Sequence, residues 1–202
     1  MNEPRTHSFG QDASPSFIDR AGRYLSTRRL ARLLGPTQEK RCADIGCGFD
    51  AALGRALFAD ARQTLLVDVA VDPSLASDRT RILEGHLPDV LTFESDGSID
   101  SIICNNVIEH LWDPLTTLRD FHRLLTPGGV CVVNVPSWWG KVALEFAAFR
   151  LKLAPASEMN DHKTYYDPRE LWPLLVQAGF SPQNIKIRRH KFRLNTVARC
   201  SR

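Results

Sequence analysis

The 202-residue chain has no uninterrupted apolar run of membrane-spanning length, for which a helix needs about 20 residues. It also lacks an N-terminal basic segment followed by an apolar segment and a small-residue cleavage site, the pattern of a secretion signal. These absences argue against membrane-spanning and exported proteins. We therefore expect a cytoplasmic protein without a transmembrane segment.

A large net charge is missing as well, because the formal charge at pH 7 is only +3. Such a balance does not require a nucleic-acid or membrane partner. Seven Lys or Arg residues and no acid lie between Ile185 and Arg202. Aromatic residues do not interleave with them as a base-stacking platform requires. A nucleic-acid partner is therefore disfavoured, while a peripheral membrane contact stays open.

No zinc-ligand spacing occurs among the five cysteines, and their odd number does not suggest a disulfide framework. Four of them fall in or beside segments that read as buried strands. We expect reduced cysteines that act as small core residues, and no metal site. The cysteines are Cys42, Cys47, Cys104, Cys131 and Cys200.

The length and a hydrophobic content of 43% suffice for one full core, so one domain is expected. Residues 1–16 are polar and show no periodicity, which predicts a disordered lead. Residues 17–202 should form the domain, beginning with helices over 17–35, where apolar residues recur at helical spacing before Gly35-Pro36.

The most informative stretch runs from Arg41 to Asp50, as RCADIGCGFD. An apolar segment leads into two glycines one residue apart, and residues 51–58 have helical composition. This order predicts a strand, a glycine turn and a helix, with Asp50 as the N-cap. Glycines in such a turn let backbone N–H groups and the helix N-terminus approach a polar ligand.

Two ligands suit this turn. Gly46-x-Gly48-x-x-Ala51 satisfies the loose dinucleotide fingerprint, and Asp68 lies 20 residues beyond Gly48, where a ribose-binding acid is expected. Asp44 before the first glycine gives Asp-Ile-Gly-Cys-Gly, which resembles the S-adenosylmethionine loop of class I methyltransferases. The third glycine usual in that family is replaced by Asp50. A tight turn that binds no ligand is the remaining, less favoured alternative.

A second motif strengthens the methyltransferase resemblance. Residues 99–104 read as a buried strand, and Glu109-His110-Leu111 follows its carboxyl end, where ligands of doubly wound sheets bind. The Glu-His-Leu sequence resembles the ubiquinone-biosynthesis O-methyltransferase branch. Residues 84–87 resemble the segment that lies along the adenine edge in the same family.

The resemblance covers residues 38–202 and implies an α/β, Rossmann-like, doubly wound sheet of seven mostly parallel strands, closed by an antiparallel C-terminal strand. It implies S-adenosylmethionine as the methyl donor and S-adenosylhomocysteine as the product. The cofactor-binding residues that it implies are Asp44, Gly46, Cys47, Gly48, Asp68, Val69, Glu84, Gly85, His86, Leu87, Asn105 and Asn106.

Residues 137–166 exceed what a minimal nucleotide-binding sheet needs. A broad apolar helical face over 141–153 predicts a lid, a substrate wall or a dimer contact, or else an extra core helix. Trp138, Trp139, Tyr165 and Tyr166 flank it, and their rings favour an acceptor with a sizeable apolar or ring portion, either a small molecule or a lipid-linked one.

Methyl transfer to a hydroxyl requires a base, whereas a neutral amine does not. His110 and His162 are the candidate catalytic bases because histidine titrates near neutrality. Either could instead be a structural, hydrogen-bonded histidine. Two other functions stay open: an NAD-dependent oxidoreductase, and a methyltransferase-like module that binds the cofactor without turnover.

Overall fold

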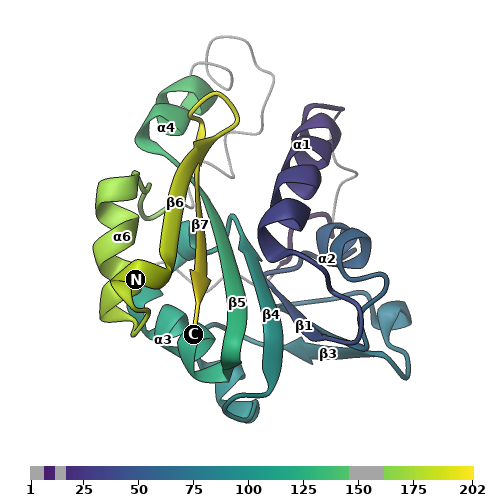
Figure 1. Ribbon diagram of the computed structural model, residues 1–202. Coiled ribbons are helices and arrows are strands. Elements are labelled where there is room, and N and C mark those ends of the chain that lie inside the picture. The colour runs from purple at the N-terminus through teal and green to yellow at the C-terminus, as the bar shows by residue number, and fades with distance from the viewer. Residues whose placement is uncertain (1–6, 12–16, 146–161) are drawn as a thin grey trace.

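The computed structural model describes residues 7–11, 17–145 and 162–202. Their centre is a sheet of seven strands (Figure 1). The bounds of the strands are β1 Arg41–Ile45, β2 Gln63–Asp68, β3 Thr80–Glu84, β4 Ile99–Asn105, β5 Leu125–Pro136, β6 Ile185–His190 and β7 Asn195–Ser201.

The strand order is β3-β2-β1-β4-β5-β7-β6. Strands β1 to β5 pair in parallel, while β7 is antiparallel to both β5 and β6. This confirms the expected mostly parallel sheet with an antiparallel closing strand. The order reverses between β1 and β4, and ligands of such sheets bind outside the carboxyl ends of the strands at that point.

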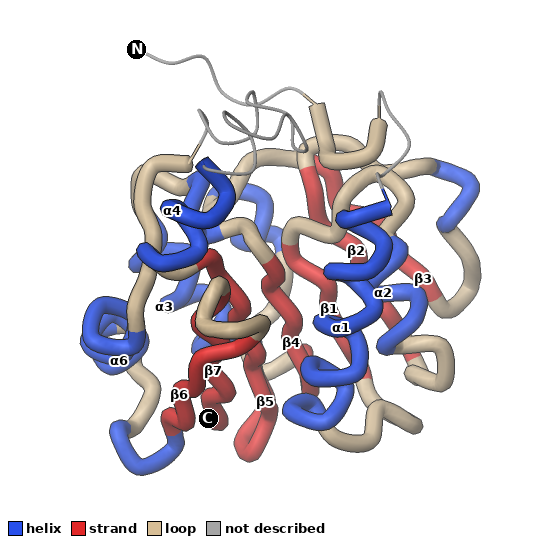
Figure 2. The backbone as a smooth tube through the Cα atoms, turned by 90° about the horizontal axis from the view of Figure 1, so that it is seen from above, coloured by secondary structure: helices blue, strands red, loops and turns tan. Residues whose placement is uncertain are grey.

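Helices pack on both faces of the sheet, as Figures 1 and 2 show. Leu30 and Leu53, from α1 and α2, pack in one apolar cluster with Val132 of β5. Phe121 of α3 and Leu171 of α6 pack in the other cluster. The helices are α1 Phe17–Leu34, α2 Ala52–Leu57, α3 Pro114–Leu124, α4 Trp138–Glu145 and α6 Pro168–Gln177, with short 3-10 turns η1 Pro73–Leu75, η2 Asp89–Phe93, η3 Ile108–His110 and η5 Pro182–Asn184.

Apolar side chains alternate between the two clusters along the central strands. In β4, Ile102 packs in the cluster with α3 and α6, and Ile103 packs in the cluster with α1 and α2. A parallel strand covered by helices on both faces has no polar side, because its alternating side chains are buried in turn. The five cysteines are buried free thiols, as their apolar surroundings led us to expect.

Several boundaries differ from the sequence-based prediction. One helix spans 17–34 where more than one was expected, and β5 begins at Leu125, before the apolar run of 130–133. Asp50 is not the N-cap of α2: Ala51 takes that place in a left-handed conformation, with φ 44°. The Asp50 carboxylate nevertheless accepts from the Ala52 N–H at 3.3 Å.

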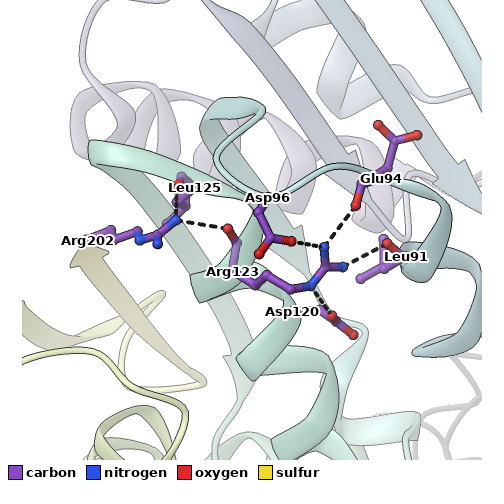
Figure 3. A network of polar contacts seen from close by, with 7 residues as sticks. All are labelled: Leu91, Glu94, Asp96, Asp120, Arg123, Leu125 and Arg202. Carbon is purple, nitrogen blue, oxygen red and sulfur yellow. Dashed lines mark hydrogen bonds and ion pairs between the residues drawn. The ribbon is translucent and has the colours of Figure 1, made fainter.

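A polar network at the amino edge of the sheet joins η2 to α3 (Figure 3). The Arg123 guanidinium donates to the backbone oxygens of Leu91 and Glu94 and to the carboxylates of Asp96 and Asp120, at 2.7 to 2.9 Å. Such multiple pairing fixes the loop between β3 and β4 far from the carboxyl edge. Within the described ranges, no helix combines the length and apolar character that crossing a membrane requires.

Candidate functional site at the carboxyl edge of the sheet

The glycine turn after β1 closely contacts its neighbours. Gly46 and Gly48 have φ values of 76° and 74°, which favour glycine. A Cβ on Gly46 would lie 2.1 Å from Cγ2 of Val107, and one on Gly48 would lie 3.1 Å from the Phe9 carbonyl oxygen. The turn therefore requires glycine at the first position for packing as well as for backbone conformation.

Asp68, the last residue of β2, faces this turn. Its Oδ2 accepts from the Gly48 N–H at 2.8 Å, and its Oδ1 accepts from the Val69 N–H at 2.7 Å. A twenty-residue separation in sequence thus becomes a direct contact, because β1 and β2 are adjacent parallel strands. Both carboxylate oxygens are thus fixed by backbone N–H groups at the end of β2.

A short N-terminal turn lies over Asp68. The Ser8 hydroxyl donates to Asp68 Oδ1 at 2.5 Å and accepts from the Ala70 N–H at 2.9 Å. The Phe9 carbonyl accepts from the Phe49 N–H at 2.9 Å, and Ser8 itself is buried. Residues 7–11 belong to the lead that was expected to be disordered, and no sequence signal marked Ser8 as a contact of the site. The remainder of 1–16 lies outside the described residues.

Asp44 is fully buried below the glycine turn. Its Oδ2 has no hydrogen-bond partner among the described residues. Burial raises the pKa of the carboxyl from 3.8 to about 7; the Gly54 N–H lowers it and the charge of Asp68 raises it further. A Cβ on Gly54 would lie 2.5 Å from Asp44 Oδ2, so this glycine, which sequence reasoning passed over, gives the acid its space.

The segment after β3 lies beside the end of β2. Asp68 and Glu84 are opposite each other in the register of β2 and β3, and the Gly85 N–H donates to the Asp68 backbone oxygen at 3.0 Å. Glu84 Oε1 accepts from the Val71 N–H at 2.8 Å. His86 is exposed and Leu87 is half-buried. The structure thus places Glu84 and Gly85, two of the four residues predicted for the adenine edge, next to the predicted ribose acid.

Asparagines occupy the carboxyl ends of β4 and β5. Asn134 Nδ2 donates to Asn105 Oδ1 at 2.9 Å and lies 3.5 Å from Asn106 Oδ1. Asn106 has a φ of 56°, and its N–H donates to the Asn134 backbone oxygen. Asn195 of β7 also reaches Asn106 Oδ1, at 3.5 Å. The sequence analysis did not assign Asn134 or Asn195 to the site. Each lies within an apolar strand pattern, which does not identify the residue that its side chain contacts.

His110 and His162 come together from segments 52 residues apart, with ring centroids 4.7 Å from each other. His162 Nδ1 lies 2.9 Å from the Tyr165 hydroxyl. The backbone oxygen of Glu109 accepts from the Lys163 and Thr164 N–H groups. Three potential metal-ligand atoms lie within 4.8 Å of one another here, one each from Glu109, His110 and His162. They are close enough together to bind one metal ion.

The aromatic residues predicted to meet the acceptor differ in exposure. Trp138 and Trp139 are exposed at the start of α4, whereas Tyr165 and Tyr166 are buried and Tyr166 belongs to the main core. The Trp138 ring lies tilted against the Tyr165 ring, with centroids 5.4 Å apart, and its Nε1 donates to the Glu170 carboxylate. A groove of about 570 Å³ passes the two tryptophans and is also lined by Val142, Asp167, Arg189 and Arg193.

Much of the segment 137–166, predicted to be a lid-like insertion, lies outside the described residues. Helix α4 covers its beginning, and 162–166 form its end. The apolar helical face expected over 141–153 falls mostly within 146–161, which the structure does not describe.

Comparison with known proteins agrees with this fold. A family model described as a methyltransferase domain matches residues 18–184. A ubiquinone biosynthesis O-methyltransferase of Psychrobacter arcticus is 27% identical over 158 residues, covering 72% of this chain and 61% of that protein. A probable S-adenosylmethionine-dependent methyltransferase of Mycolicibacterium smegmatis is 30% identical, covering 71% of this chain and 55% of its own length.

The chain therefore spans less than two thirds of the length of these relatives. A solved S-adenosylmethionine-dependent methyltransferase from Archaeoglobus fulgidus superposes with a TM-score of 0.64 at 16% identity, covering 89% of this chain and 94% of that structure. The family model covers most of the domain, from α1 to η5. The chain belongs to the methyltransferase-domain family, with the fold of the class I S-adenosylmethionine-dependent enzymes.

Proposed function

We propose that the chain binds S-adenosylmethionine at the carboxyl edge of the sheet and transfers its methyl group to an oxygen or nitrogen of a small-molecule or lipid-linked acceptor. The buried Asp44 carboxyl group carries this proposal. A carboxylate with an unsatisfied oxygen destabilises a folded protein unless a cation pairs with it. The α-amino group of the cofactor is such a cation, and Asp44 lies two residues before the first glycine of the turn.

The other predicted cofactor residues suit the remaining parts of the molecule. Gly46 and Gly48 carry no side chains at the turn, which favours close approach of the methionine and ribose portions to the backbone. The Asp68 carboxylate can accept two ribose hydroxyls once the Ser8 hydroxyl leaves Oδ1. Binding therefore requires the N-terminal turn to move, and Ser8 competes with the cofactor for the acid.

When bound, S-adenosylmethionine supplies a methyl carbon on a sulfonium, which needs alignment with a nucleophile and little covalent assistance. The chain's contribution is to hold the acceptor in line and exclude water. If the acceptor is a hydroxyl, His162 accepts its proton as the new carbon–oxygen bond forms, while Tyr165 orients the imidazole through Nδ1. Trp138 and Trp139 offer the exposed apolar surface for its ring or chain.

Calorimetric titration with S-adenosylhomocysteine and with NAD tests the cofactor directly. We expect saturable binding of S-adenosylhomocysteine and none of NAD, because the NAD alternative gives Asp44 no cationic partner. A labelled-methyl assay with a metabolite extract then separates an enzyme from a binding module. Binding of NAD alone would overturn the proposal, and binding of S-adenosylhomocysteine without labelling of any acceptor would support the module.

Replacing His162 with alanine should lower the rate of methyl transfer to a hydroxyl acceptor by about 100-fold to 10,000-fold, the usual contribution of a general base. The affinity for S-adenosylhomocysteine should stay within about twofold. Tyr165→Phe removes one hydrogen bond at Nδ1 and should cost roughly tenfold in kcat. Equal losses of kcat and cofactor affinity would contradict a role confined to proton transfer.

A chelator tests the alternative that Glu109, His110 and His162 bind a metal ion. If His162 acts as a base, treatment with EDTA leaves the wild-type rate unchanged. Loss of activity on chelation, with recovery on adding a divalent metal ion, would instead assign Glu109, His110 and His162 to a metal site.

A further inference from the structure

The turn between β6 and β7 departs from ordinary backbone preferences. Lys191, Phe192 and Arg193 have φ values of 48°, 54° and 72°, three successive non-glycine residues in the left-handed region. Each such residue costs folding free energy that glycine would avoid. Phe192 is also 92% exposed at the tip. A turn that retains two cations and a solvent-exposed ring at such positions points to an interaction with a partner.

Positive charge surrounds this tip. A shallow cavity of about 650 Å³ is lined by Arg29 of α1 and by residues of the hairpin. The hairpin residues that line it are Arg188, Arg189, His190, Lys191, Phe192 and Arg193. Burial lowers the pKa of His190, and the charges of Lys191 and Arg29 lower it further. The charge of Arg189 is compensated by Asp167, whose Oδ2 lies 3.6 Å from a guanidinium nitrogen of Arg189. The tip therefore presents a local excess of cations.

The hairpin tip is fixed to the start of α4. The Ser137 N–H donates to the Leu194 carbonyl at 3.0 Å, and its hydroxyl donates to the Arg193 carbonyl at 2.6 Å. A Cβ on Gly140 would lie 2.1 Å from the Leu194 carbonyl oxygen, so the two backbones are in close contact. Figure 1 shows the tip, α4 and the upper end of α1 at the same edge of the molecule.

Exposed apolar side chains of α4 adjoin the cationic tip. Trp139 is 61% exposed and Val142 is 55% exposed. Together with Arg29, Arg188, Lys191 and Phe192 they form what we name the basic–aromatic rim. Because β7 begins opposite Pro136, at the carboxyl end of β5, the rim lies at the same edge as the cofactor turn.

We propose that the basic–aromatic rim docks the protein on an anionic lipid surface. Cations next to an anionic bilayer are attracted to its headgroups, and aromatic rings are stable at the level of those headgroups. Nucleic acid fits the rim less well, because single strands bind in grooves whose successive aromatic side chains stack on bases. Here the ring of Phe192 is exposed at the tip of a turn, and the exposed Val142 of α4 is aliphatic.

Co-sedimentation of the full chain with vesicles tests this docking. We expect binding to phosphatidylcholine vesicles that contain phosphatidylglycerol, no binding to phosphatidylcholine alone, and weakening by salt. The double variant Arg188→Gln/Lys191→Gln should bind about fivefold more weakly per neutralised cation. Phe192→Ser should also reduce binding, because it removes the ring at the tip.

Matched controls use the same substitutions elsewhere on the surface. Phe93→Ser replaces a ring that is 79% exposed on η2, and Arg62→Gln/Arg79→Gln removes two exposed cations beside β2 and β3. These controls should bind vesicles like the wild type. S-adenosylhomocysteine affinity should be unchanged in the rim variants, so a failure of docking is separable from a failure of the proposed function.

Three outcomes would overturn the docking proposal. They are equal binding to neutral vesicles, equal losses in the control variants, and binding to a single-stranded oligonucleotide that exceeds vesicle binding. Thermal unfolding of each variant identifies any that has lost its fold. Because Lys191 and Phe192 adopt positive φ, Phe192→Gly serves as a second variant, which relieves the backbone and still removes the ring.

Discussion

Replacing Asp68 with alanine should weaken the binding of S-adenosylhomocysteine by about 2 to 4 kcal/mol, or roughly 30-fold to 1,000-fold in dissociation constant. The substitution removes the acceptor for two ribose hydroxyls and two backbone N–H contacts that shape the turn, those of Gly48 and Val69. Isothermal titration calorimetry measures the loss. An unchanged dissociation constant would exclude Asp68 as the ribose ligand.

Two further variants separate binding from local packing. Asp72→Ala removes a nearby acid whose carboxylate accepts from the Ser74 backbone N–H, and it should leave affinity unchanged. Ser8→Ala removes the hydroxyl that holds Asp68 Oδ1 and should strengthen binding severalfold. Weaker binding by the Ser8 variant would show instead that the N-terminal turn supports the ligand.

The order of elements was predictable because each strand of the sheet carries a strong local signal. Continuous apolar runs such as 130–133 indicate strands buried on both faces, and the glycines at 46 and 48 mark the turn that follows β1. The family resemblance supplied the strand count and the antiparallel closure. Boundaries were less accurate, since the left-handed Ala51 and the extended start of β5 depend on contacts outside their own segments.

The site was predictable only where its residues lie in local motifs. Asp44, Gly46 and Asp68 stand at fixed distances from recognisable strand ends. Ser8 and Gly54 gave no such signal, since a serine in a polar lead and a glycine in a helical stretch are both common. Their roles arise from contacts across the fold, with Asp68 and with Asp44.

Replacing Asp44 with asparagine should stabilise the ligand-free protein above pH 7 by up to about 4 kcal/mol. The folded carboxyl has a pKa of about 7, compared with 3.8 before burial, so the folded state binds the proton more tightly than the unfolded chain does. Stability from this group is complete below pH 3.8 and is lost as the pH rises towards 7. Asparagine at position 44 cannot ionise, so the variant keeps this stability at every pH.

Urea unfolding at several pH values checks this expectation. The difference in unfolding free energy between Asp44→Asn and the wild type should grow by about 1.4 kcal/mol per pH unit between roughly pH 4 and pH 7, and then level off. All other titrating groups are common to both proteins, so the difference isolates Asp44. A difference that does not vary with pH would mean that the carboxyl titrates alike in the folded and unfolded chains.

The same group links folding to the proposed cofactor. A cationic amino group next to Asp44 favours the carboxylate, so S-adenosylhomocysteine binding at pH 6 should release a proton from the wild type. Calorimetry in buffers of different ionisation enthalpy counts that proton. The Asp44→Asn variant should release no proton from this site and should bind S-adenosylhomocysteine more weakly. The same variant should be more stable to unfolding than the wild type. Equal proton release from both proteins would remove Asp44 from the cofactor site and leave its burial unexplained.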